Sequence, residues 1–187
     1  MEAFVTTLLL AALVNAGDRS QLLCAALALR FDRPGQMIAA IVIASGIGSA
    51  LAAFGGVVVG TWISRDALSL FYALSLLFAA AGMLAWRRPV NVLGGWKIGP
   101  FLTTLLGIAI VQLGDKGQFI IAATAARSHD ALWPLLGGWA GTVLGLVPAV
   151  VLRERMAELP LTAIRISAGI IILLVGITLV LLAFGLI

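Results

Sequence analysis

The chain has 187 residues, of which 62% are hydrophobic and 11% are charged. Soluble domains carry about 25% charged residues, so this composition excludes an ordinary water-soluble fold. The net charge of +4 lies in short islands between apolar runs. Runs of about 20 apolar residues are long enough to cross a bilayer as helices. We therefore expect an all-α membrane protein whose first partner is the lipid bilayer, and we expect no nucleic-acid partner.

Six transmembrane helices are expected from the apolar runs. In chain order they cover residues 3–29, 36–61, 67–86, 98–126, 131–152 and 162–186. The longest polar connection, at 87–97, separates two three-helix repeats at 1–86 and 98–187. Because three is an odd number, the second repeat enters the membrane from the opposite side, so we expect an inverted repeat.

The expected helix at 3–29 carries a polar string, Asn15 to Gln21, in its middle. Ionised side chains at bilayer depth are costly unless they are paired or face a cavity, so Asp18 and Arg19 are functional candidates. Asn15 and Asp18 are three residues apart and share a helix face. Their oxygen atoms suit hard cations such as calcium and manganese(II). An alternative role for Asn15, and for Gln112 in the second half, is hydrogen bonding between helices.

The expected helices at 36–61 and 131–152 both carry a small residue at every fourth position. Such a row allows another backbone to approach closely, although packing of this kind is common in membrane helices. The two rows consist of Gly48, Ala52, Gly56 and Gly60 in the first repeat, and Gly137, Gly141, Gly145 and Ala149 in the second.

The expected helix at 98–126 repeats the polar string 97 residues after its first occurrence, with Asp115 in the place of Asp18. Both aspartates fall near the middle of their helices, so at 1.5 Å per residue both are expected near mid-bilayer. The matched positions are Asn15 and Gln112, Gly17 and Gly114, Arg19 and Lys116, and Gln21 and Gln118. We expect Ser20, Gln21 and Gln118 to line the transport path, and both glycines to allow close approach of backbones or to expose a carbonyl.

The basic residues of the two strings are expected to pair across the repeats. Neighbours on a helix point about 100° apart, so Arg19 and Lys116 do not face the aspartates that precede them. We therefore expect Asp18 to pair with Lys116, and Asp115 to pair with Arg19. An alternative is that these charges only hold the two halves together.

Basic residues are unequally divided between alternate connections. The side after the first, third and fifth helices holds eight, and the opposite side holds only Arg65 and Arg127. Because basic loops remain in the cytoplasm, both termini are expected outside it, in a multi-pass protein of the cell inner membrane. The eight residues are Arg30, Arg33, Arg87, Arg88, Lys97, Arg153, Arg155 and Arg165.

The two strings resemble the signature of uncharacterised protein family 16, Glu-x-Gly-Asp-Lys/Arg-Ser/Thr, which occurs once in each half. That family includes Golgi calcium/manganese transporters and bacterial manganese exporters. The resemblance implies a cation/proton antiporter with its site at the midplane, between the first and fourth helices. The chain departs from the signature at three positions, because amides replace both glutamates, at Asn15 and Gln112, and Gly117 replaces Ser/Thr.

The departures leave the transported species open. Two aspartates and two basic residues sum to zero, whereas two further glutamates would give −2, which matches a divalent cation. Export of manganese(II) or calcium in exchange for protons is the leading hypothesis. The alternatives are an exporter of a small polar or zwitterionic solute, and a non-transporting subunit of a hetero-oligomer. An enzyme is not expected, and neither is a cofactor, because the chain has one cysteine, one histidine and no phosphate-binding loop.

Overall fold

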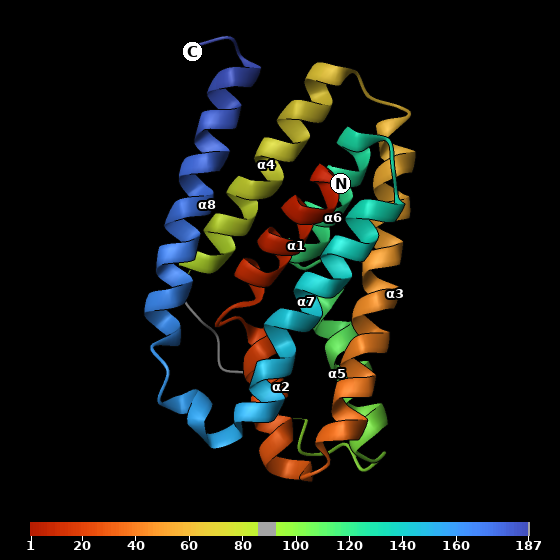
Figure 1. Cartoon of the computed structure of the whole chain (residues 1–187), viewed down its shortest axis with the longest axis vertical. Helices are drawn as coiled ribbons and strands as arrows, with labels where there is room; N and C mark the ends of the chain where they lie inside the picture. Colours follow the sequence, from red (N-terminus) through yellow and green to blue (C-terminus); the bar gives the residue numbers. More distant parts are fainter. Residues whose placement is uncertain (86–92, 187) are drawn as a thin grey trace.

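The computed structural model describes residues 1–85 and 93–186, and these residues form a bundle of helices (Figure 1). The expectation of an all-α protein is confirmed for this part of the chain. The elements in chain order are α1 (Glu2–Asn15), α2 (Arg19–Phe31), α3 (Pro34–Gly60), α4 (Arg65–Leu84), α5 (Pro100–Gln112), α6 (Lys116–Ser128), α7 (Leu132–Leu152), the 3-10 helix η1 (Arg153–Ala157) and α8 (Leu161–Ala183).

The expectation of continuous helices at 3–29 and 98–126 is wrong, because each is broken at its polar string. The first breaks between α1 and α2, and the second between α5 and α6, whose axes differ by 63°. Gly17 and Gly114 adopt φ values of +66° and +70°, a left-handed conformation that glycine adopts without steric cost. Both glycines were expected to lie within continuous helices, but in the structure each lies in the break between two helices.

Both breaks have the same backbone geometry. The residue before the glycine is extended in each case, with φ and ψ of −64° and 118° at Ala16 and of −61° and 114° at Leu113. The aspartate after the glycine is extended too and becomes the N-cap of the next helix. Aspartate is among the preferred N-cap residues. The Gly-Asp pair therefore favours both the end of one helix and the beginning of the next.

The four other expected helices are present as α3, α4, α7 and α8, and each is long and apolar enough to cross a membrane. The bent pair α5–α6 is a fifth candidate if both parts belong to one span, whereas α1 alone is a shorter apolar helix. Among the sequence expectations, the helix end at Trp86 and the basic residues Arg87 and Arg88 lie outside the described residues.

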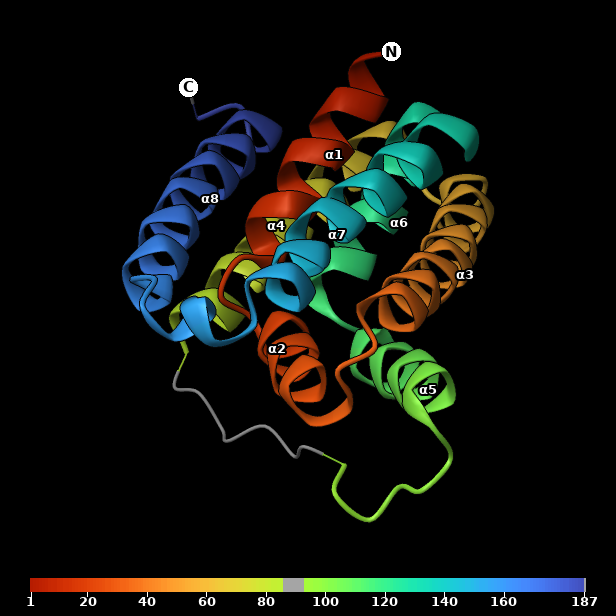
Figure 2. The same ribbon diagram turned by 60° about the horizontal axis from the view of Figure 1, so that its bottom comes forward.

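The two halves of the chain interlock through the broken helices. Helix α3, from the first half, packs along α5 and α6 of the second half, and α7 packs along α1 and α2 of the first. Figure 2 shows both pairs from one end of the bundle. Helices α4 and α8 pack against each other at the side of this core. The interlocking brings the two breaks into the interior.

The small residues of α3 and α7 occupy the places where these helices meet the broken ones. A Cβ added to Gly56 would lie 2.1 Å from the carbonyl oxygen of Ala122 in α6. A Cβ added to Gly141 would lie 2.2 Å from the carbonyl oxygen of Leu8 in α1. Both distances are far below van der Waals contact, so the backbones approach as closely as they do because no side chain lies between them.

We expect Gly56→Ala to destabilise the protein, because the new methyl group must push α3 away from α6. Overpacking of this kind costs about 1–3 kcal/mol. The control is Gly55→Ala, since a Cβ at the neighbouring position meets nothing within 4 Å. Thermal unfolding in detergent, monitored by size-exclusion chromatography, should show a lower midpoint temperature of unfolding for Gly56→Ala and an unchanged one for Gly55→Ala. Equal midpoints would contradict the close-packing assignment.

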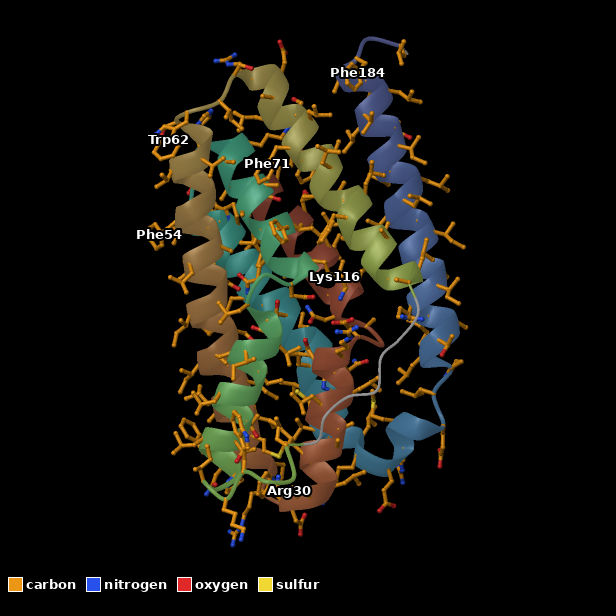
Figure 3. All side chains as sticks on the ribbon, turned by 180° about the vertical axis from the view of Figure 1, so that it is seen from behind. Arg30, Phe54, Trp62, Phe71, Lys116 and Phe184 are labelled. Carbon is orange, nitrogen blue, oxygen red and sulfur yellow. The ribbon has the colours of Figure 1, made fainter. Side chains whose placement is uncertain are left out.

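Different parts of the chain lie at the two ends of the bundle. Both termini lie toward one end, whereas the α2–α3 connection and η1 lie at the other (Figure 1). Arg30 marks that second end in Figure 3, opposite Trp62 and Phe184. The Arg30 guanidinium donates to the carbonyl oxygens of Leu93 (2.6 Å) and Trp96 (2.7 Å), which ties the end of α2 to the segment before α5.

Candidate functional site

The two breaks meet at the side chain of Lys116. Its Nζ lies 2.7 Å from Oδ1 of Asp18 and 3.5 Å from Oδ1 of Asp115. The lysine is 6% exposed, and the aspartates are 13% and 21% exposed. Figure 3 shows Lys116 near the centre of the bundle, with α2 and α6 beginning beside it. Two carboxylates from opposite halves of the chain therefore share one buried ammonium group.

The expected crossed pairing holds for one pair and is wrong for the other. Asp18 pairs with Lys116, as the sequence predicts, but Arg19 is exposed and makes no ion pair with Asp115. Asp115 instead lies near its own neighbour Lys116, which the helical geometry assumed from sequence had excluded. The reason is that Asp115 is an N-cap outside the helix, so the 100° separation of helical neighbours does not apply to it.

The local charge of this site is −1 rather than zero. The sequence sum counted both basic residues, but only Lys116 is buried between the aspartates, and Arg19 faces outward. The carboxylate of Asp18 makes no cap hydrogen bond to the backbone. Asp115 also contacts the backbone, because its Oδ2 accepts a 3.4 Å hydrogen bond from the Gly117 amide. Among the described residues, the Asp18 carboxylate is therefore held by a short ion pair alone, whereas Asp115 makes longer contacts to both the ammonium group and the backbone.

The two amides of the strings are buried at equivalent places but make different contacts. Nδ2 of Asn15 donates to the Ala11 carbonyl oxygen one turn earlier in α1, at 2.7 Å. Nε2 of Gln112 donates across helices to Oγ of Ser45 in α3, at 3.3 Å. Oε1 of Gln112 is buried and has no hydrogen-bond partner among the described residues. A buried acceptor without a donor is costly, and a cation or a donor on a ligand would satisfy it.

The hydroxyl groups of α3 were not among the predicted site residues. Ser45 contacts Gln112, and Ser49, one turn further along, is buried with its Oγ unpartnered. Ser20 of the first string is also buried, and its hydroxyl has no hydrogen-bond partner in the part of the chain that the structure describes. Two serines four residues apart in an otherwise apolar span were a readable signal, because polar groups within membrane helices generally face the interior.

Gln21 and Gln118 also differ in their contacts. The amide of Gln21 bridges two backbones, with Nε2 donating to the Gly145 carbonyl oxygen and Oε1 accepting from the Gly17 amide, both at 2.7 Å. Gln118 lies beside Gly48 of α3, where an added Cβ would be 2.6 Å from its Nε2. The structure thus places both glutamines beside the breaks, and their role in lining a transport path stays a prediction.

A cavity of about 620 Å³ lies between α3 and the broken pair α5–α6. Its wall is mainly aliphatic and small residues, with the amides of Gln112 and Gln118 as its polar side chains. Gly114, at the break, also lines it. The second break is therefore accessible from this cavity.

A smaller and more polar cavity of about 390 Å³ lies where α1 begins and α6 ends. Its lining includes Glu2, Tyr72, Thr124, Arg127 and Asp130. The Arg127 guanidinium lies 5.3 Å from the centre of the Tyr72 ring, a cation–π contact. Helix α6 thus connects this cavity at its end to Lys116 at its start.

The arrangement can offer oxygen ligands but few charged ones. Within residues 1–85 and 93–186, no three His, Cys, Asp or Glu side chains gather in one place. A cation at the breaks would therefore bind the two aspartates together with neutral oxygens from amides, hydroxyl groups or the backbone. The helix ends at α1 and α5 present backbone carbonyls with partial negative charge.

Comparison with known proteins gives two findings. A family model described as "Divalent cation/proton antiporter GDT1" matches residues 3–90 and 100–185. A protein of Vibrio cholerae serotype O1 named "Putative manganese exporter" is 34% identical over 180 residues, which cover 93% of this chain and 88% of that protein. No solved structure matches the chain.

Proposed function

The chain belongs to the GDT1 family of divalent cation/proton antiporters, and we propose that it exports manganese(II) or calcium from the cytoplasm in exchange for protons. The observation that carries this proposal is the convergence of Asp18 and Asp115, from two broken helices, on one buried ammonium. Broken helices that meet around polar groups are a recurring way to build ion sites in transporters.

The site that we propose lies at the two breaks, near the membrane midplane. Asp18 and Asp115 are the charged ligands, and Asn15 and Gln112 supply neutral oxygens. Each aspartate occupies the N-cap position of a helix, where a negative charge offsets the partial positive charge of the helix N-terminus. The C-terminal carbonyls of α1 and α5 add partial negative charge, which favours a cation.

Lys116 acts in this proposal as a tethered cation that occupies the carboxylates when no metal ion is bound. Nζ lies within 3.5 Å of both aspartates, so a divalent cation that binds them must displace the ammonium group. The site with the ammonium group and the site with a divalent cation would then differ by one positive charge, whereas an empty site and a cation-bound site would differ by two. This exchange reduces the desolvation cost of an empty acidic site.

The membrane arrangement that we propose has six spans in two inverted repeats. The pair α1–α2 would be the sixth span, bent at Gly17 as α5–α6 is bent at Gly114. The support is the matching backbone geometry of the two breaks, together with the reciprocal packing of α3 and α7. Basic residues at the end opposite the termini favour both termini outside the cytoplasm, in the inner membrane.

A divalent cargo is supported by the charge of −1 at the breaks and by the printed name of the Vibrio cholerae relative. The second candidate cargo is a small zwitterion. The 620 Å³ cavity with its amides is larger than an ion needs, and carboxylates beside an ammonium group can bind both ends of a zwitterion.

Proteoliposomes with an acidic interior test the proposal. Outward proton movement should drive uptake of manganese(II) or calcium by the purified protein, and dissipating the pH gradient with an ionophore should abolish that uptake. Protein-free liposomes give the background. Uptake of a neutral amino acid without uptake of either cation would replace the divalent cargo with the zwitterion. No pH-driven flux of any of these would contradict transport by the isolated chain.

A further inference from the structure

Gln21 holds the first helix break against the opposite half of the protein. Its Oε1 accepts from the Gly17 amide at the break, and its Nε2 donates to the Gly145 carbonyl oxygen in α7, both at 2.7 Å. The side chain is 7% exposed. One amide therefore joins the break to α7, and we call this pair of hydrogen bonds the Gln21 latch.

The second half contains the same three residues at the same spacing. Gln118, Gly114 and Gly48 correspond to Gln21, Gly17 and Gly145, because each pair is 97 residues apart in the sequence. Gly145 lies in α7 of the second half, beside the break of the first half. Gly48 lies in α3 of the first half, beside the break of the second half. The long helix of each half therefore faces the broken helix of the other. The elements of a second latch are thus all present.

The second latch is open in this structure. Gln118 makes neither of the two hydrogen bonds that Gln21 makes, although both halves of this region are described. The 620 Å³ cavity lies here instead, lined by all three residues. Oε1 of Gln112 is buried beside it without a hydrogen-bond partner. The equivalent residues of the two halves therefore make different contacts in this structure.

The open latch needs little movement to close. An added Cβ on Gly48 would lie 2.6 Å from Nε2 of Gln118, so the amide already lies against the backbone of α3. At the closed latch, an added Cβ on Gly145 would lie 2.7 Å from the Cβ of Asn15. Both sites depend on a glycine, because any side chain would occupy the space that the amide or the neighbouring helix uses.

We propose that Gln21 and Gln118 are positioning residues that close the two halves of the cation site in alternation. In the state seen here, the Gln21 latch is closed and the second break is open to the cavity. In the other state, Gln118 donates to the Gly48 carbonyl oxygen, accepts from the Gly114 amide and closes that cavity, while Gln21 releases Gly145. The functional meaning of the two states rests on the proposed transport, but the latches themselves do not.

Hydrogen–deuterium exchange of the purified protein tests the latches without any cargo. In the wild type, amides at 16–18 should exchange about tenfold more slowly than those at 113–115, because only the first latch is closed. Gln21→Ala should accelerate exchange at 16–18 about tenfold and, by shifting the population, slow it at 113–115. If Gln21 has only a structural role, Gln21→Ala should accelerate exchange at 16–18 and leave exchange at 113–115 unchanged or faster. That result would overturn the proposal.

Gln118→Ala is the matched variant, and it removes no hydrogen bond that this structure contains, so the protein should fold even if Gln21→Ala does not. It should slow exchange at 16–18, because the competing state has lost its latch. Faster exchange at 16–18 in Gln118→Ala would also overturn the proposal.

Manganese(II) transport by oriented proteoliposomes adds a readout of sidedness. A fall in the population of one state raises the apparent KM on the side to which that state opens. The two alanine variants should therefore raise KM on opposite sides of the membrane. A rise on the same side for both would contradict alternation. Absence of transport in the wild type, with reciprocal exchange intact, would refute the proposed function and leave the latches standing.

Discussion

Asp18→Asn is expected to reduce cation flux by about 100-fold or more. The change removes the carboxylate that holds Lys116 at 2.7 Å and leaves a single acidic ligand, Asp115, at the breaks. At an effective dielectric of 20, a dication and one negative charge about 4 Å apart attract by roughly 8 kcal/mol before desolvation. Even a third of that value corresponds to about a hundredfold in binding.

Manganese(II) uptake into acid-loaded proteoliposomes measures this loss, and Asp32→Asn is the control. Asp32 pairs with Arg153 at 2.5 Å but is exposed at the end of the bundle, so its loss should leave flux unchanged. Asp115→Asn should resemble Asp18→Asn. Removing one partner of a buried pair also destabilises, so each variant's unfolding midpoint must be measured alongside flux. Wild-type flux in a stable Asp18→Asn protein would exclude the site at the breaks.

The double substitution Asn15→Glu with Gln112→Glu is expected to tighten manganese(II) binding by about 100-fold or more. It changes the charge at the breaks from −1 to −3 and restores both glutamates of the family signature. Position 112 is prepared for a carboxylate, because the Ser45 hydroxyl lies 3.3 Å from the glutamine amide and can donate to an acid. Asn15 lies at the equivalent place in the other half.

Isothermal titration of manganese(II) in detergent measures the change, with each single glutamate as an intermediate. Gln112→Glu alone should tighten binding more than Asn15→Glu alone, because Gln112 already has a free oxygen and Asn15 is hydrogen-bonded within its own helix. Adding Ser45→Ala to Gln112→Glu should reverse part of the gain. Unchanged affinity in the double variant would show that the amides do not face the bound ion.

The bounds of the unbroken helices could be predicted from the lengths of the apolar runs to within a few residues. Helices α3, α7 and α8 begin and end within three residues of the expected bounds. The broken helices could not be read in that way. Apolar residues on both sides of each break continue the helical pattern, and a single glycine within a helix is tolerated at a cost of about 1 kcal/mol. In the structure, an extended residue followed by a left-handed glycine ends the helix at each break.

The candidate site was predictable in its residues and less so in its contacts. The repeated Gly-Asp-basic string identified Asp18, Asp115 and Lys116, because charge within an apolar span has few roles. The pairing of Arg19 with Asp115 failed because it assumed that both aspartates sit within helices. Ser45 escaped notice because its role depends on Gln112, which lies 67 residues away in the sequence.

Composition and repetition in the sequence by themselves determined the membrane class, the helical architecture and the doubled motif, because bilayer length and the cost of buried charge act on each segment separately. The tertiary structure alone decided that Lys116 serves both aspartates while Arg19 faces outward, and that Gln21 is latched while Gln118 is not. These features depend on how α3 and α7 pack across the opposite broken helices. Two strings that share the same glycine, aspartate and glutamine positions can therefore make different contacts, because their partners are residues distant in the chain.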